Sequence, residues 1–180
     1  MVYIMLAPGF EEMEAIAPID LLRRANIEVT TVGIPGKRIP GSHGIGVETD
    51  ISVDQMKYED MDMIVLPGGL VGVTNLKNSK EVTAALEYAR DNDKFIAAIC
   101  AAPTALVKLG ITDGKNVTCY PSCEQEMTGA NVVPGAAWVR DGKLITGTSA
   151  GCATPFALAL VAALRGQEAA DDVAGKIVIR

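Results

Sequence analysis

Short apolar runs alternate along the chain with segments of helical periodicity. The runs are almost continuously apolar, which is typical of strands buried on both faces of a parallel sheet. They lie at residues 2–7, 27–32, 63–66, 95–99, 116–119 and 144–146. Helical periodicity marks residues 14–24, 80–91, 102–109 and 154–164. Strands that alternate with helices predict βαβ units, so we expect an α/β fold with a mostly parallel, doubly wound central sheet and helices on both faces.

Two regions depart from this alternation. Residues 33–54 are rich in glycine and proline and predict loops with a short antiparallel excursion. The stretch WVRDGKLIT, residues 138–146, places Asp141-Gly142 between two β-prone runs, which is a strong hairpin signal. The sequence contains no repeat, low-complexity tract or linker, so we expect residues 1–180 to form a single domain.

The composition narrows the class of protein. Of the 180 residues, 49% are hydrophobic and 21% are charged, which is typical of a globular chain. A net charge of −6 disfavours a nucleic-acid partner, because phosphate binding needs clustered lysine and arginine. No apolar run approaches the roughly 20 residues of a membrane span, and the N-terminus has no export pattern. We therefore expect a cytoplasmic protein that binds no membrane and keeps its four cysteines reduced.

Two candidate nucleophiles follow predicted strands, where the ligand crevice of an open α/β sheet lies. GTSAG at residues 147–151 matches the serine motif of α/β-hydrolases, but their histidine follows the serine, and the only histidine here, His43, precedes it. We interpret GTSAG as a small-residue turn into a helix. Cys100 follows FIAAI, and Pro103 suits a first helical turn, whose free N–H groups would lower the pKa of a thiol. On these residues alone, an inert core cysteine is an equal alternative.

A family resemblance favours the nucleophile. The chain resembles the ThiJ/PfpI superfamily, in its parkinsonism-associated deglycase branch, over essentially its whole length, in the stretches LAPGFEEMEAIAPIDLLRRANIEVTTVG, MIVLPGG, FIAAICAAPTAL and GTSAGCATPFALALVAALRG. The resemblance implies a flavodoxin-like sandwich and a homodimer. It also implies a cysteine that is both nucleophile and oxidation site, which corresponds to Cys100, and a glutamate beside it, which corresponds to Glu14.

The resemblance gives a role to the groups around the thiol. A Glu14 carboxyl kept protonated by burial can hydrogen-bond to a thiolate or sulfinate, or move a proton. Without the resemblance, Glu14 would only complement a helix dipole. LPGG places Gly68 and Gly69 after a strand, and the N–H groups of Gly69 and Ala101 correspond to the family's oxyanion pocket. Glu11 and Glu12 receive no role.

The chain departs from many relatives at one position. They carry a histidine in a Thr-x-His-Pro pattern, whereas this chain has VTCYPS, with Tyr120 at the matching place. A tyrosine, with a pKa of about 10, is a poor base, so protease activity of the PfpI type is disfavoured. In dimeric relatives the loop that corresponds to His43 lies near the partner's active site, so His43 could act across the interface; the alternative is a solvated loop histidine.

The remaining cysteines and glycine-rich segments indicate neither a metal nor a nucleotide. Cys119 and Cys123 lack the second pair of ligands that a tetrahedral zinc site needs. We expect Cys119 and Cys152 to be structural, and Cys123 to be an ordinary helix-start thiol, with the alternative that it resolves an oxidised Cys100. GSHGIG and GITDGK fit neither the dinucleotide nor the P-loop spacing, so we expect no cofactor.

The sequence therefore predicts a cofactor-independent cysteine enzyme of glyoxalase or deglycase type, which acts on methylglyoxal, its adducts or similar small reactive carbonyls. Cys100 would add to the carbonyl carbon, Glu14 would transfer protons, and the N–H groups of Gly69 and Ala101 would hold the oxyanion. The competing interpretation is a redox sensor or chaperone-like protein in which Cys100 is oxidised to sulfinate.

Overall fold

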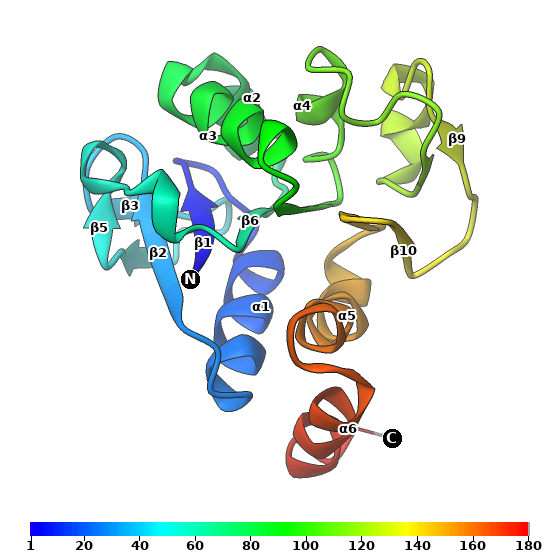
Figure 1. The fold of residues 1–180 in the computed structure, drawn as a ribbon. Coiled ribbons are helices and arrows are strands. Elements are labelled where there is room, and N and C mark those ends of the chain that lie inside the picture. Colours follow the sequence, from blue (N-terminus) through cyan, green and yellow to red (C-terminus); the bar gives the residue numbers. More distant parts are fainter. Residues whose placement is uncertain (180) are drawn as a thin grey trace.

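The structure is a computed structural model that describes residues 1–179. A seven-stranded sheet forms the centre of the molecule. The strand order is β10-β11-β7-β6-β1-β2-β5, and every neighbouring pair is parallel except β10 with β11. The strands are β1 Val2–Leu6, β2 Val29–Gly33, β5 Ile51–Ser52, β6 Met63–Leu66, β7 Phe95–Ile99, β10 Trp138–Asp141 and β11 Leu144–Gly147. The expected α/β fold with a mostly parallel sheet is confirmed (Figure 1).

Helices cover both faces of this sheet (Figure 1). One layer holds α1 (Glu12–Arg24) and α5 (Ala153–Arg165), with α6 (Gln167–Lys176) packed against α5; the other holds α2 (Leu70–Asn78), α3 (Lys80–Asp91) and α4 (Thr104–Val107). Successive side chains of a strand point to opposite faces. Ile4 and Leu6 of β1 therefore enter the core under α1 and α5, whereas Tyr3 and Met5 enter the core under α2 and α3.

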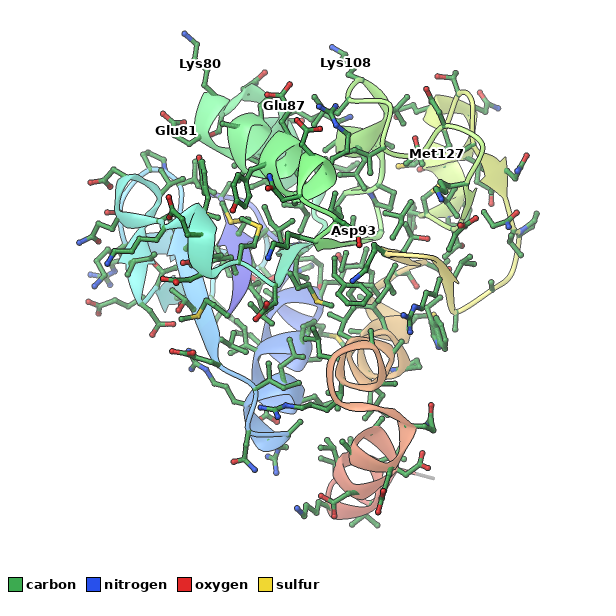
Figure 2. The ribbon with its side chains drawn as sticks, in the orientation of Figure 1. Lys80, Glu81, Glu87, Asp93, Lys108 and Met127 are labelled. Atoms are coloured by element: carbon green, nitrogen blue, oxygen red, sulfur yellow. The ribbon has the colours of Figure 1, made fainter. Side chains whose placement is uncertain are left out.

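Helix α3 shows how an amphipathic pattern chooses the buried face. Its apolar side chains pack on the sheet: Val82, Ala85, Leu86 and Ala89. Lys80, Glu81 and Glu87 point away from the sheet into solvent (Figure 2). The helix begins where the Ser79 hydroxyl accepts a hydrogen bond from the N–H of Val82, at 3.3 Å.

The predicted loop region and hairpin are confirmed. β3 (Arg38–Pro40) and β4 (Gly46–Glu48) form the antiparallel excursion, and β10 and β11 form the hairpin around Asp141-Gly142. The excursion ends in β5, which adds an edge strand to the main sheet and was not predicted. Short 3₁₀ segments lie at Val53–Gln55, Tyr58–Asp60, Pro121–Glu126 and Ala150–Cys152. None of the helices in residues 1–179 has the length and apolar character needed to cross a membrane.

Two predicted elements are wrong in extent. The helix expected at 102–109 is reduced to α4, because Thr104, Ala105 and Leu106 donate their N–H groups three residues back, as in tight turns, rather than four. The strand expected at 116–119 is only β8 (Asn116–Val117), which pairs with β9 (Asn131–Val132) outside the main sheet. The N–H of the next residue, Thr118, donates instead to the Thr146 hydroxyl at 2.8 Å.

Two helices were not predicted, and one begins earlier than expected. Helix α1 starts at Glu12 rather than residue 14, since Glu11 supplies the cap. Helix α2 follows two glycines, and its first two residues, Leu70 and Val71, are apolar but exposed. Its apolar residues therefore do not mark one buried face, so the sequence shows no clear helical periodicity. Helix α6 buries only Ala170 and Val173, so its apolar pattern is too sparse to identify.

Candidate active site

The carboxyl ends of three neighbouring strands bring the predicted site residues together. β7, β6 and β1 are adjacent in the sheet, and the chain continues from them to Cys100, Gly68 and Glu14 respectively. An open α/β sheet binds its ligands at this edge. Residues that are far apart in the sequence therefore meet because three parallel strands end side by side.

Cys100 forms a sharp elbow between β7 and the turn before α4. Its φ is 66°, in the left-handed region that residues other than glycine rarely adopt. Its N–H donates to the carbonyl of Gly147 at 2.9 Å, and its carbonyl accepts the N–H of Tyr120 at 2.8 Å. These bonds hold a conformation that costs about 1–2 kcal/mol in a non-glycine residue. Backbone strain of this kind is concentrated at functional sites.

Glu14 is almost completely buried beside this elbow, with 1% of its surface exposed. The N–H of Gly68 donates to its Oε2 at 2.8 Å. Its Oε1 is buried and has no partner of ordinary hydrogen-bond geometry within residues 1–179. Burial raises the pKa of Glu14 to about 7, a rise that the interaction with the Cys100 thiol opposes and the charge of Glu11 reinforces. The carboxyl therefore keeps its proton over part of the neutral range.

The thiol of Cys100 is half-buried and interacts with this carboxyl. Burial and the negative charge of Glu14 together raise the pKa of Cys100 to about 12, against the N–H groups of Ala101 and Gly69, which lower it. The expectation of a lowered thiol pKa is therefore wrong for a thiol that faces an ionised Glu14. Two N–H groups do not outweigh burial and a neighbouring carboxylate.

The pair of Glu14 and Cys100 loses its protons in two separate steps. The first proton leaves the pair near the pKa of Glu14, about 7, and the second leaves near that of Cys100, about 12. After the first loss, the pair is either a carboxylate beside a thiol or a thiolate beside a carboxylic acid. The two pKa values favour the first form. The second form is the reactive one, in which the N–H groups of Gly69 and Ala101 stabilise the thiolate and Glu14 is the proton donor.

Two glycines allow the loop after β6 to approach both groups. A Cβ on Gly68 would lie 2.3 Å from Oε2 of Glu14 and 2.6 Å from Cβ of Cys100. Gly69 has φ of 90°, and a Cβ there would lie 2.3 Å from the carbonyl oxygen of Gly9. Glycine is required at the first position by contacts, and at the second by both contacts and backbone conformation.

Tyr120 contacts this site through its backbone, since its N–H donates to the carbonyl of Cys100, while the residue is 44% exposed.

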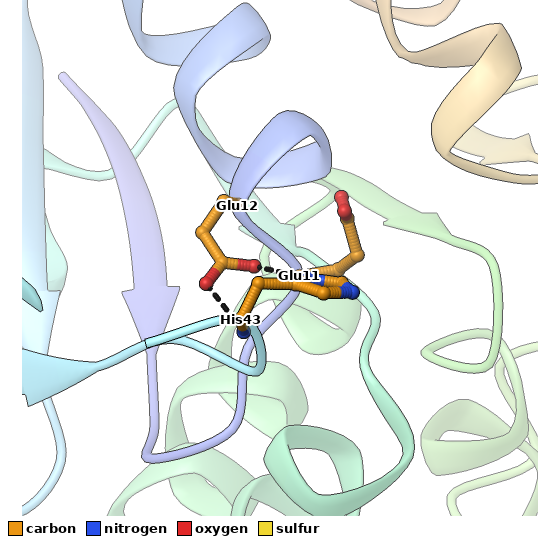
Figure 3. A group of neighbouring side chains, drawn as sticks. All are labelled: Glu11, Glu12 and His43. Carbon is orange, nitrogen blue, oxygen red and sulfur yellow. Dashed lines mark hydrogen bonds and ion pairs between the residues drawn. The ribbon is translucent and has the colours of Figure 1, made fainter. Parts of the chain in front are cut away.

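His43 has a different partner. Its Nδ1 lies 2.9 Å from Oε2 of Glu12, and its backbone N–H donates to Oε1 of Glu12 at 2.7 Å (Figure 3). The ring is exposed, and the hydrogen bond to Glu12 raises its pKa. Neither residue supplies a base in contact with the thiol.

Glu12, which sequence reasoning left without a role, anchors the loop that carries His43. Burial alone would raise the pKa of Glu12, but the hydrogen bonds from His43 outweigh it and lower the pKa to about 2. A Cβ on Gly41 would lie 2.3 Å from Oε1 of Glu12, so a glycine is needed there too. Glu11, Glu12 and His43 also bring three potential metal ligands within 4.8 Å of one another, but hydrogen bonds already engage both oxygens of Glu12.

The other cysteines are free thiols outside the site. Cys119 and Cys123 are buried in the core under α2 to α4, and burial raises the pKa of both. Cys152 caps α5, and the preceding Ser149 lies 3.9 Å from its sulfur. The interpretation of GTSAG as a turn into a helix is confirmed.

Known proteins resemble this chain over almost its whole length. The model of the DJ-1/PfpI family matches residues 1–163. Protein dj-1beta of Drosophila melanogaster is 39% identical over 178 residues, which cover 98% of this chain and 95% of that protein. Its crystal structure matches with a TM-score of 0.95 at 38% identity, covering 99% of this chain and 97% of that chain. A deglycase of Pyrococcus horikoshii is 32% identical over 131 residues, 73% of this chain and 78% of that protein. The chain thus belongs to the DJ-1/PfpI family.

Proposed function

We propose that the protein is a cofactor-independent cysteine enzyme of glyoxalase or deglycase type that acts on methylglyoxal or its adducts. The observation that carries the proposal is the contact of the buried Glu14 carboxyl with the Cys100 thiol, with the N–H groups of Gly69 and Ala101 at the same sulfur. The name of the Pyrococcus relative, a deglycase, supports the class of reaction.

The pair can perform each proton transfer of a methylglyoxal conversion. The Cys100 thiolate adds to the aldehyde carbon, and the new oxyanion takes its proton from Glu14 while Gly69 and Ala101 donate hydrogen bonds. The Glu14 carboxylate then removes the proton on that carbon and returns it to the adjacent carbon, while the hydroxyl proton passes to the oxygen of the adjacent carbon, which leaves a lactoyl thioester on Cys100. Water hydrolyses the thioester, releasing lactate and the thiol. The aldehyde carbon of the substrate is oxidised and the adjacent ketone carbon is reduced by the same two electrons, so no external oxidant is needed.

The test is lactate formation from methylglyoxal. Cys100→Ser and Glu14→Gln should each lose at least about 100-fold in kcat/KM, because the first removes the nucleophile and the second removes the group that transfers protons. Cys152→Ser removes a half-buried thiol elsewhere and serves as the control. Lactate production that survives Cys100→Ser would overturn the mechanism. Mass spectrometry after dilute peroxide separates the redox interpretation: oxidation of Cys100 to sulfinate without methylglyoxal conversion would favour a sensor.

We also propose that the protein is a homodimer. Met13 and Ile16 leave large apolar surfaces exposed on α1, with 59% and 43% of each residue accessible. Ile45, in the loop next to His43, is 60% exposed. Apolar patches of this kind favour association. Sedimentation of the wild type and of a Met13→Lys, Ile16→Lys variant is the test: a wild-type monomer would exclude the dimer, and with it a role for His43 across an interface.

A further inference from the structure

We propose that Glu11 is a positioning residue for the pair of Glu14 and Cys100, holding the Glu14 carboxyl beside the thiol and keeping a negative charge next to it. The inference rests on the function proposed above. Glu11 is the N-cap of α1, and its Oε2 accepts the N–H of Glu14 at 2.8 Å. An N-cap bond of this kind is found at many helix starts and by itself indicates only a structural role. The other contacts of Glu11 therefore decide whether it also positions the site.

Three hydrogen bonds close a ring through the site. The backbone N–H of Glu11 donates to the carbonyl of Gly68 at 3.0 Å. The N–H of Gly68 donates to Oε2 of Glu14 at 2.8 Å, and the N–H of Glu14 donates back to Oε2 of Glu11. A shift of any member therefore moves the other two. With Oε2 held by the ring, Oε1 is left for the thiol, since it has no other partner within residues 1–179.

The charge of Glu11 acts on the same pair. Its carboxylate lies within 4.8 Å of the His43 ring and of Glu12 (Figure 3), and it faces Glu14 from the cap. A like charge disfavours ionisation of a neighbouring carboxyl, and the pKa of Glu14 is raised in part by Glu11. An uncharged cap would keep the hydrogen bond but lose this effect, so the two contributions can be separated by substitution.

The measurement is the pH dependence of Cys100 alkylation by iodoacetamide, followed by mass spectrometry. The midpoint compared is that of the change in alkylation rate near pH 7, where Glu14 beside the thiol ionises. Glu11→Gln keeps an acceptor and removes the charge beside Glu14, so this midpoint should fall by about 0.5 to 1 pH unit. Glu11→Asp keeps both and should restore the wild-type midpoint. Glu11→Ala also removes the acceptor and should reduce kcat/KM for methylglyoxal about 10-fold, mainly in kcat.

Ser79→Ala is the matched control, because it removes a cap of the same kind from α3, away from the thiol. It should leave the alkylation midpoint unchanged while destabilising the fold to a similar degree. A Glu11→Gln midpoint within 0.2 pH units of wild type, in a folded protein, would overturn the charge effect. A Glu11→Ala variant whose kcat/KM matches that of Ser79→Ala would overturn the positioning role and leave Glu11 as a cap only. Alkylation needs no carbonyl substrate. If the wild type fails to convert methylglyoxal but the midpoint of Glu11→Gln shifts, the proposed function fails and the effect of the Glu11 charge on the pair stands.

Discussion

Replacing Gly68 by alanine would test whether close approach of the loop after β6 sets the geometry of the pair. The backbone of Gly68 is not left-handed, so alanine is compatible with its conformation. The new Cβ would lie 2.3 Å from Oε2 of Glu14, and an ordinary contact needs at least 3.4 Å. The carboxyl or the loop must therefore move by about 1 Å. That movement stretches the 2.8 Å bond from the N–H of Gly68 beyond useful length.

The magnitude follows from the lost bond and the lost alignment. A hydrogen bond to a charged group contributes about 1.5–3 kcal/mol, which corresponds to roughly 10- to 150-fold in rate. A misplacement of about 1 Å at a reacting group has an effect of similar size. Overpacking should also lower the free energy of unfolding by about 1–3 kcal/mol. We therefore expect Gly68→Ala to fold but to lose about 100-fold in kcat/KM.

The assay measures lactate formation and the rate of Cys100 alkylation at pH 7, with urea unfolding to confirm the fold. Gly46→Ala is the matched control, because a Cβ there meets nothing within 4 Å and its backbone is not left-handed. If Gly68→Ala and Gly46→Ala agree within about twofold in both rates, the reasoning from close approach is refuted.

Three further predictions concern stability and selectivity. Cys100→Gly should be more stable than Cys100→Ala by about 1 kcal/mol in urea unfolding, since only glycine relieves a φ of 66°; equal stability would mean that the elbow is not strained. His43→Ala should lower the melting temperature most between about pH 4.5 and 6.5. The pKa of His43 is raised, so the stabilisation it gives is complete below its ordinary pKa of 6.5 and is lost as the pH rises through the raised value. The pKa of Glu12 is lowered, so the stabilisation it gives is lost as the pH falls from 4.5 toward about 2. A melting-temperature difference that grows above pH 8 would contradict this assignment. Ser149→Ala should convert methylglyoxal at the wild-type rate, and a loss above about fivefold would reopen GTSAG as a functional motif.

The sequence predicted the strands that carry the site better than the segments that follow them. β1, β6 and β7 are buried on both faces, so their apolar runs have no competing interpretation. The segment after Cys100 contains alanine, proline and leucine in a helical spacing. However, backbone hydrogen bonds of Cys100 with Gly147 and Tyr120 hold Cys100 in an elbow, and tight turns follow it in place of regular helix. Local periodicity carries no information about those bonds.

The residues around the thiol were predictable only in part. Its place between a strand and a helix start made Cys100 an equal choice between nucleophile and core residue, and the family resemblance favoured the nucleophile and supplied Glu14. The structure brings both together with Gly68, Gly69 and Ala101. The direction of the thiol pKa was wrong because sequence shows a helix start but not the depth of burial or the charge of a residue 86 positions earlier. Glu12 was overlooked because its partners lie in the loop that carries His43, and Glu11 because its cap bond is local and only the structure shows its N–H bonded to Gly68. Gly41, which lies where the Glu12 carboxylate approaches, is a sequence signal for Glu12.

At the Cys100 elbow, the residue that would give the most stable fold differs from the residue that the proposed chemistry needs. A residue with φ of 66° is better served by glycine than by any side chain that can form a thiolate. A library of variants screened for thermal resistance alone would therefore enrich substitutions that discard the cysteine, and would report them as improvements. Laboratory evolution of this scaffold needs selection for the reactive sulfur in every round, because persistence of the fold favours its loss.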